Sequence, residues 1–131
     1  MTVKYTFKKS ERLTLNNLIE TLFKEGHIIY QYPLKIIWLP IIGNFISPAQ
    51  VLFSVSRKRF KKAVDRNRIK RKIKELYRIE KFFLYEELKK RNKQIILCIT
   101  YTGNNNDPSL QELRIRLKQG FDELLKELDK Y

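Results

Sequence analysis

The segment from Arg57 to Lys74 concentrates positive charge in a chain that is otherwise nearly balanced. Eleven of its eighteen residues are Lys or Arg and only Asp65 is acidic, so it carries ten of the fourteen net positive charges. Apolar residues recur in and after this run at i, i+4 and i+7, namely Ile69, Ile73 and Leu76. This is the spacing of one buried helix face. The segment therefore predicts a surface helix with one apolar side and one cationic side.

The cationic side is predicted to form a continuous stripe along this helix. The stripe consists of residues at i, i+4, i+7 and i+11, namely Asn67, Arg71, Lys74 and Arg78. Two further cations, Arg68 and Lys70, flank it. The stripe is about three turns, or roughly 16 Å, long. Like charges at this spacing repel and weaken an isolated helix, so an anionic partner would stabilise it.

A solvated helix face and a membrane-bound helix both fit the stripe less well. A merely solvated face would interleave both signs of charge. A helix lying on a membrane would carry Trp, Phe and Leu on its apolar side, and this segment does not. The focused charge therefore favours a surface that binds a polyanion such as RNA.

Length and composition indicate one globular domain, spanning residues 1–131. The chain is 43% hydrophobic and 32% charged, which is typical of a folded protein with a real core. Its single Cys98 excludes an intrachain disulfide, and His27 is its one histidine, so no Cys/His zinc set is expected. No apolar run approaches the roughly eighteen residues of a membrane span, and no apolar signal core follows Met1. We expect a cytoplasmic protein without a membrane partner.

The order of predicted elements is helix, strands, helix, strand, helix. The first helix is predicted to begin after Thr14 as N-cap and to end at Gly26. Strands are predicted over Leu34–Leu39 and Val51–Ser56, followed by the basic helix and its continuation over Glu80–Arg91. A strand over Gln94–Tyr101 and a helix after the N-cap Ser109 complete the order. We therefore expect an α/β (α+β) two-layer sandwich with one mixed sheet, in the order α-β-β-(β)-α-β-α.

This order predicts where several individual residues lie. Trp38 and Cys98 lie in strands and are expected in the core, whereas His27, just after a helix stop, is expected in a loop. Leu110 opens the apolar series of the C-terminal helix and is expected on its inner face. The loop from Pro40 to Gln50 is unusually apolar, so it either packs back on the domain or contacts a partner.

The sequence offers phosphate binding rather than catalysis. A nuclease needs a carboxylate cluster for metal ions or a paired acid and base, and Asp65, Glu75 and Glu80 are not spaced to form either. We therefore predict no catalytic residue and no metal site on this chain. Cationic side chains can instead contact backbone phosphates, and the neutral Asn67 among them is suited to a specific hydrogen bond. The predicted RNA-binding residues are Arg57, Lys58, Arg66, Asn67, Arg68, Lys70, Arg71 and Lys74.

The same residues carry a family resemblance. The run Arg66-Asn67-Arg68-Ile69-Lys70-Arg71, preceded by Lys62-Ala63-Val64 and by the strand-like Phe53–Lys58, resembles the signature of the bacterial ribonuclease P protein subunit. The likeness extends to the leading helix that ends Leu22-Phe23-Lys24-Glu25-Gly26 and, through the order of elements, to nearly the whole chain. Two features depart from the family: Ile19 stands where an aromatic residue is common, and no glycine precedes Ala63.

The resemblance implies a fold and a function. The fold would be ribosomal S5 domain 2-like, with a rare left-handed β-α-β crossover. The function would be that of the protein subunit of a ribonucleoprotein endonuclease that removes the 5′ leader of precursor tRNA. The RNA subunit would hold the catalytic Mg²⁺, the basic helix would bind that RNA, and the leader would enter a cleft between the first helix and the sheet. Phe23 and Arg12 are the candidate leader contacts.

Two other classes of protein share part of this pattern. A non-enzymatic basic RNA-binding protein, such as a ribosomal protein, would have the same size and charge, and only the motif or activity with a catalytic RNA separates the two. A DNA-binding helix-turn-helix protein would need a short helix before its recognition helix. The strand predicted over Val51–Ser56 occupies that place, so DNA is not an expected partner.

Overall fold

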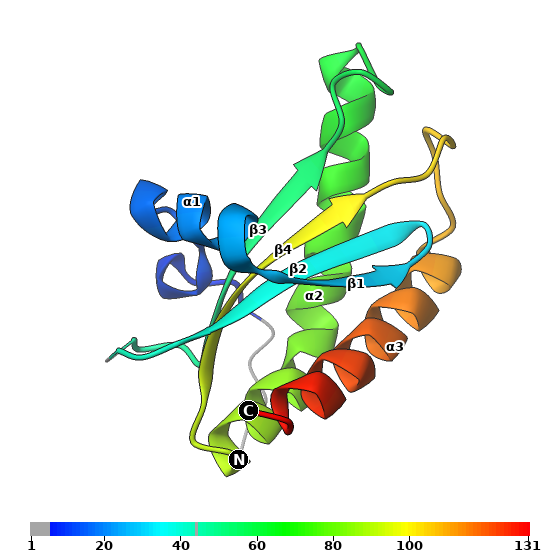
Figure 1. The fold of residues 1–131 in the computed structure, drawn as a ribbon. Coiled ribbons are helices and arrows are strands. Elements are labelled where there is room, and N and C mark those ends of the chain that lie inside the picture. The colour runs from blue at the N-terminus through cyan, green and yellow to red at the C-terminus, as the bar shows by residue number, and fades with distance from the viewer. Residues whose placement is uncertain (1–5, 44) are drawn as a thin grey trace.

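The computed structural model describes residues 6–43 and 45–131, in which helices cover both faces of a four-stranded sheet (Figure 1). In chain order the elements are the 3-10 helix η1 (Lys9–Glu11), α1 (Asn16–Glu25), β1 (His27–Gln31), β2 (Leu34–Ile41), β3 (Ala49–Val55), α2 (Ala63–Lys90), β4 (Gln94–Tyr101) and α3 (Leu110–Leu128). The predicted α+β class and the predicted mixed sheet are confirmed.

The strands lie in the order β1-β2-β4-β3. β2 is antiparallel to both β1 and β4, whereas β3 and β4 are parallel, with Val51 opposite Leu97. The connection from β3 to β4 runs through α2. In Figure 1 α2 lies behind the sheet, and β4 lies to the right of β3 with both strands pointing upward. This crossover is therefore left-handed, as the resemblance implied, against the usual rule.

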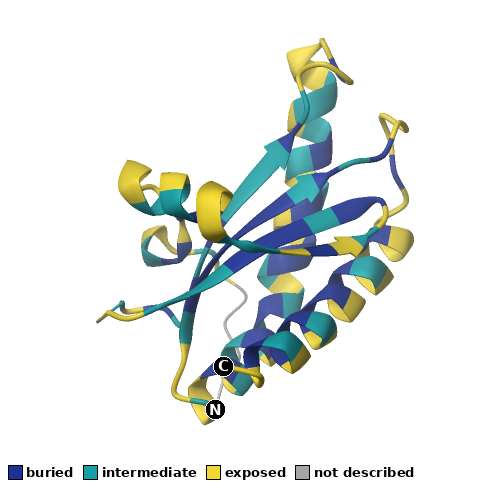
Figure 2. Ribbon diagram, in the orientation of Figure 1, coloured by how far each residue is buried: buried dark blue, intermediate teal, exposed yellow. Residues whose placement is uncertain are grey.

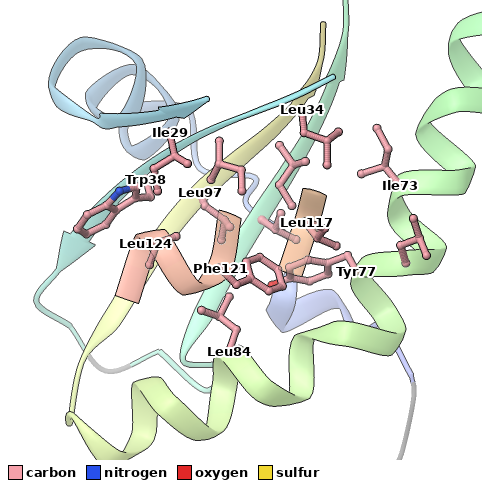
Figure 3. Packing of buried hydrophobic residues seen from close by; sticks show 14 of the residues in the cluster. Ile29, Leu34, Trp38, Ile73, Tyr77, Leu84, Leu97, Leu117, Phe121 and Leu124 are labelled. Atoms are coloured by element: carbon pink, nitrogen blue, oxygen red, sulfur yellow. The ribbon is translucent and has the colours of Figure 1, made fainter. Parts of the chain in front are cut away.

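The main core lies between the sheet and the helices α2 and α3 (Figure 3). Its α2 residues follow the predicted helical spacing, since Ile69, Ile73 and Tyr77 are at most 1% exposed. Tyr77 meets Phe121 of α3 edge to face, with ring centroids 6.2 Å apart. Trp38 of β2 is fully buried, and its Nε1 donates a hydrogen bond to Glu127 at 3.1 Å. The prediction that Trp38 is a core residue is confirmed.

The opposite face of the sheet packs against α1. Leu22 is buried there together with Ile37, Ile96 and Cys98. Burial raises the pKa of the Cys98 thiol, which is consistent with the inert core cysteine expected from the sequence. A Cβ at Gly26 would lie 2.5 Å from Ile37 Cγ2. It would lie closer still to the Leu22 carbonyl oxygen, so glycine ends α1 where a side chain would clash with both the helix backbone and β2.

Four expectations about the chain need correction or completion. His27 begins β1 instead of lying in a loop, and its ring packs 4.8 Å from the ring of Trp38. The N-cap of α1 is Leu15, not Thr14, and it has no side-chain cap. Leu110, the first residue of α3, is 48% exposed, and the buried face of that helix begins with Leu113. The apolar loop is not packed back throughout, since Ile42 and Ile46 are exposed.

Candidate nucleic-acid interface

The first turns of α2 project beyond the sheet and are largely exposed, as the upper end of Figure 2 shows. These turns contain the predicted motif. Ile69 and Ile73 are buried and attach α2 to the core. Before Ile69, the buried apolar residue is Phe60, which lies in the turn that precedes the helix. The cationic residues are therefore displayed on a rigid element outside the core.

A groove of about 540 Å³ runs along one side of this part of α2. The N-terminal segment, β3 and α2 form its walls. Its lining residues are Phe7, Arg12, Leu13, Thr14, Val51, Leu52, Phe53, Asn67, Lys70, Arg71 and Lys74. The groove thus brings together four predicted RNA-binding residues of α2 and, from the other wall, the predicted leader contact Arg12.

The charge of the groove has one sign. Arg12, Lys70, Arg71 and Lys74 are cationic, and none of the described residues that line the groove is acidic. Such a concave surface with a single sign of charge attracts phosphates from a distance and can neutralise several of them at once. Asn67 adds an amide that both donates and accepts hydrogen bonds.

Two aromatic side chains, Phe7 and Phe53, line the groove, and both contact the buried Tyr77. Phe7, Phe53 and Tyr77 contact each other pairwise, with ring centroids 5.6 to 6.0 Å apart. Arg12 Cζ lies 5.3 Å and Lys74 Nζ 5.4 Å from the centroid of the Phe7 ring. A cation above an aromatic face is held by the ring's negative potential, so Phe7 orients one cation from each wall.

A buried polar network fixes the N-terminal wall. Glu11 forms an ion pair with Lys81 of α2 and accepts hydrogen bonds from the Lys8 N–H at 2.5 Å and the Tyr85 hydroxyl at 2.8 Å. Burial alone would raise the pKa of Glu11, but the hydrogen bonds from Lys81, Lys8 and Tyr85 outweigh it and the pKa is lowered. The carboxylate is therefore charged and hydrogen-bonded, and the segment carrying Phe7 and Arg12 is fastened to α2.

The backbone also attaches this segment to the sheet. The Leu13 N–H donates to the Val51 carbonyl at 3.0 Å, and Arg12 forms a parallel bridge with Val51. Arg12 itself remains exposed. The wall of the groove is thus an extension of the sheet beside β3.

Two arginines of the motif have partners within the chain. Arg66 Nη1 donates to the carbonyls of Phe60 and Lys61, at 2.7 and 3.0 Å, so it shapes the turn before α2. Arg68 lies 3.7 Å from Asp65 in a partly exposed ion pair. Further along the stripe, Arg78 pairs with Glu75 at 2.5 Å. Among the described cations of the motif and the stripe, Lys70, Arg71 and Lys74 are therefore the best placed to bind phosphate.

The remaining predicted contacts lie outside the groove. Arg57 and Lys58 are exposed in the turn between β3 and α2. Phe23 is 53% exposed on α1, and it is not among the groove-lining residues. An apolar cluster that includes Leu22 and Ile37 packs between α1 and the sheet. The leader cleft that the resemblance implies between the first helix and the sheet stays a prediction.

Sequence reasoning missed several residues of the site. Phe7, Glu11 and Lys81 gave no local signal, because their roles depend on contacts about 70 residues apart in the chain. Phe53 was identified only as a strand residue. Within the described ranges no cluster of three His, Cys, Asp or Glu side chains could hold a metal ion. No helix in the part that the structure describes is long and apolar enough to cross a membrane.

Comparison with known proteins identifies the family of this chain. A family model described as Ribonuclease P matches residues 7–128. The ribonuclease P protein component of Porphyromonas gingivalis is 41% identical over 103 residues, which cover 77% of this chain and 74% of that protein. The protein component of Chlorobaculum tepidum is 39% identical over 83 residues, covering 60% of this chain and 54% of that one.

Solved structures share the fold. The RNase P protein of Staphylococcus aureus superposes with a TM-score of 0.66 at 20% identity, covering 88% of this chain and 96% of that one. The RNase P protein of Thermotoga maritima gives a TM-score of 0.68, also at 20% identity, with 86% and 96% covered. By its family model and its relatives, this chain belongs to the family of ribonuclease P protein components.

Proposed function

We propose that this chain is the protein subunit of a ribonuclease P ribonucleoprotein. It binds the catalytic RNA and the 5′ leader of precursor tRNA, so that the complex removes the leader by Mg²⁺-dependent endonucleolytic hydrolysis. The relatives are named protein components, which supports a role inside a larger assembly. In this proposal the catalytic groups and the Mg²⁺ ions belong to the RNA and the substrate.

One observation carries the proposal: the groove beside the Arg66-Asn67-Arg68 motif is lined by four cations and by no acidic residue among those described. Catalytic RNA and precursor tRNA are both polyanions and repel each other. A groove that neutralises phosphates at their junction lowers this repulsion, and the effect is largest where Mg²⁺ is scarce. The protein then contributes substrate affinity and productive positioning rather than chemical groups.

The residues have different roles in this proposal. Lys70, Arg71 and Lys74 contact phosphates from the α2 wall, and Arg12 contacts them from the opposite wall. Asn67 makes a directed hydrogen bond to a base or a sugar. Arg66 holds the turn before α2. The exposed Arg57 and Lys58 and the partly exposed Arg68 extend the basic surface to the catalytic RNA. Phe23 on α1 is the candidate for stacking with a leader base.

The test is precursor-tRNA cleavage at low Mg²⁺. Three reactions are compared: catalytic RNA alone, with the native protein, and with an Arg71→Ala/Lys74→Ala variant. A Lys118→Ala/Lys126→Ala variant, which removes the same charge from exposed positions of α3, is the matched control. We expect stimulation by the native protein and the control, and loss of most of it in the groove variant. If the native protein binds RNA with a steep salt dependence yet leaves cleavage unchanged, the proposal fails and only RNA binding remains.

A further inference from the structure

A second hollow lies on the other flank of α2, away from the groove. It has a volume of about 540 Å³ and is formed by the turn before α2, the start of α2 and the loop between β4 and α3. Asp65 is its one acidic member among the described residues. The side chains that give it its chemistry are Lys58, Arg59, Lys61, Lys62, Asn104 and Asn106. Four cations and an amide-bearing loop thus face each other across this hollow.

Two cations hold that loop in place. Lys72 Nζ pairs with Asp107 and donates to the Pro108 carbonyl at 2.9 Å. Arg59 Nη1 donates to the Thr102 carbonyl and, at 3.4 Å, to Asn104 Oδ1. The loop is therefore attached both to α2 and to the turn before it. Its side chains are presented in a fixed arrangement.

Inside the loop, Asn105 has a structural role. Its carbonyl accepts a hydrogen bond from the Tyr101 hydroxyl at 2.8 Å, and its Oδ1 accepts one from the Asp107 N–H at 2.9 Å. Asn104 and Asn106, on either side of it, are exposed and line the hollow. Asn105 shapes the loop. Asn104 Oδ1 already accepts from Arg59, so the Asn104 amide nitrogen and the Asn106 amide are the groups available to a ligand.

The chemistry of the hollow suits RNA. Lysines bind phosphates as point charges. Amide side chains both donate and accept hydrogen bonds, so they can engage base edges and 2′-hydroxyl groups that a simple anion does not offer. A free phosphate ion could accept hydrogen bonds from the amide NH2 groups, but it offers no base edge or 2′-hydroxyl group to the amide oxygens. The combination favours a nucleotide segment with accessible bases.

Helical geometry separates this hollow from the groove. Asp65 and Lys72, seven residues apart, lie on the same side of α2 and face the loop, whereas Asn67 and Lys74 face the groove. A helix with its side chains is about 10 Å wide. We infer that the first turns of α2 lie between two RNA segments. One segment lies in the groove, and a second, unpaired segment of the catalytic RNA lies in the hollow, where Asn104 and Asn106 contact it.

This inference rests on the proposed function for the identity of the RNA. The first measurement is the affinity of the full chain for the catalytic RNA across a salt series. An Asn104→Ala/Asn106→Ala variant is compared with a Gln111→Ala/Gln119→Ala variant, which removes two amides from α3. Loss of two neutral hydrogen bonds predicts a roughly ten-fold weaker affinity with an unchanged salt slope. The α3 control should bind like the native protein.

The second measurement maps the RNA on each side of α2. Cys98 is buried, so a cleavage reagent can be tethered to one exposed thiol, introduced by Asn106→Cys for the hollow or Thr14→Cys for the groove. The two tethers are expected to cut the catalytic RNA at different nucleotides. The inference would be overturned if the Asn104/Asn106 variant bound the catalytic RNA with native affinity, or if both tethers cut the RNA at the same nucleotides. Stimulation of precursor-tRNA cleavage by the native chain would still support the proposed function in that case. If the native chain fails to bind the catalytic RNA, both fail.

Discussion

Lys81 Nζ lies 2.5 Å from Glu11 Oε1, and these two side chains are only 4% and 7% exposed. Lys81 also donates to the Thr6 carbonyl, and Glu11 also accepts from Tyr85 and Lys8. This pair joins a segment near the N-terminus to the middle of α2. Because Phe7 and Arg12 flank Glu11, the same pair sets one wall of the cationic groove.

Removing the cation of this pair should destabilise the fold. In a Lys81→Met variant the Glu11 carboxylate would stay buried without its counterion, a change that costs about 3 to 5 kcal/mol in comparable sites. We expect a lower free energy of unfolding in urea. The double variant Glu11→Gln/Lys81→Met, which leaves no unpaired charge, should recover part of the loss. A single variant as stable as the native chain would show that the pair does not hold the segment.

Stability should also depend on pH through Glu11. Its folded-state pKa lies below the ordinary value of 4.5, so the carboxylate stabilises the fold above that value and the stabilisation is lost as pH falls through the folded pKa. Asp107 and Asp129 have pKa values lowered by Lys72 and Arg91 and add in the same direction. We expect the urea midpoint to fall between about pH 5 and about pH 3. In Glu11→Gln this fall should be smaller, and an equal fall would exclude Glu11 as a contributor.

Periodicity in the sequence predicted the elements that carry repeated local signals. Ile69, Ile73 and Leu76 located the buried face of α2, and the apolar run around Cys98 identified the interior strand β4. The short strand β1 was not located, because it follows α1 directly and His27 begins it. The position of β1 is set by its pairing with β2. This pairing is a tertiary interaction, and it does not produce a periodic pattern in the sequence.

Residue spacing predicted only the α2 wall of the groove, and on the other wall the sequence indicated Arg12 alone. Asn67, Arg71 and Lys74 share a helix face, so their spacing placed them together. The other wall depends on contacts between Glu11 and Lys81, and no pattern in the residues near Phe7 indicates them. The hydrogen bonds from Arg66 to the backbone could not be predicted either. Arg66 stands in a run of Lys and Arg residues, and the sequence gives no reason to separate it from the others as a phosphate ligand.

The groove cations should determine the salt dependence of RNA binding. A Lys70→Ala/Arg71→Ala/Lys74→Ala variant removes up to three phosphate contacts, and each contact contributes about 0.7 to 0.9 to the slope of log affinity against log salt. We expect the slope to fall by roughly 2 to 3. The variant Lys118→Ala/Lys126→Ala/Lys130→Ala on exposed positions near and in α3 has the same net charge. Equal slopes in the two variants would mean that total charge, and not the groove, governs binding.

Trp38 provides an internal reporter that should not respond to RNA. It is the one tryptophan of the chain, is fully buried, and donates to Glu127 on the side of the sheet away from α1. Unfolding in urea should shift its emission to longer wavelength. Saturating RNA should leave the emission maximum unchanged at a concentration where anisotropy shows full binding. An RNA-dependent shift would indicate that binding rearranges the core.

Replacing Arg66 should lower the free energy of unfolding more than replacing Arg68, although both residues flank Asn67. Arg66 donates to the carbonyls of Phe60 and Lys61, so Arg66→Ala should cost about 1 to 2 kcal/mol in unfolding free energy and loosen the turn. Arg68 forms a partly exposed pair with Asp65, so Arg68→Ala should cost less than about 0.5 kcal/mol. Both should weaken RNA binding. Urea titration of the two variants checks the difference, and equal stability would mean that Arg66 is not needed to hold the turn.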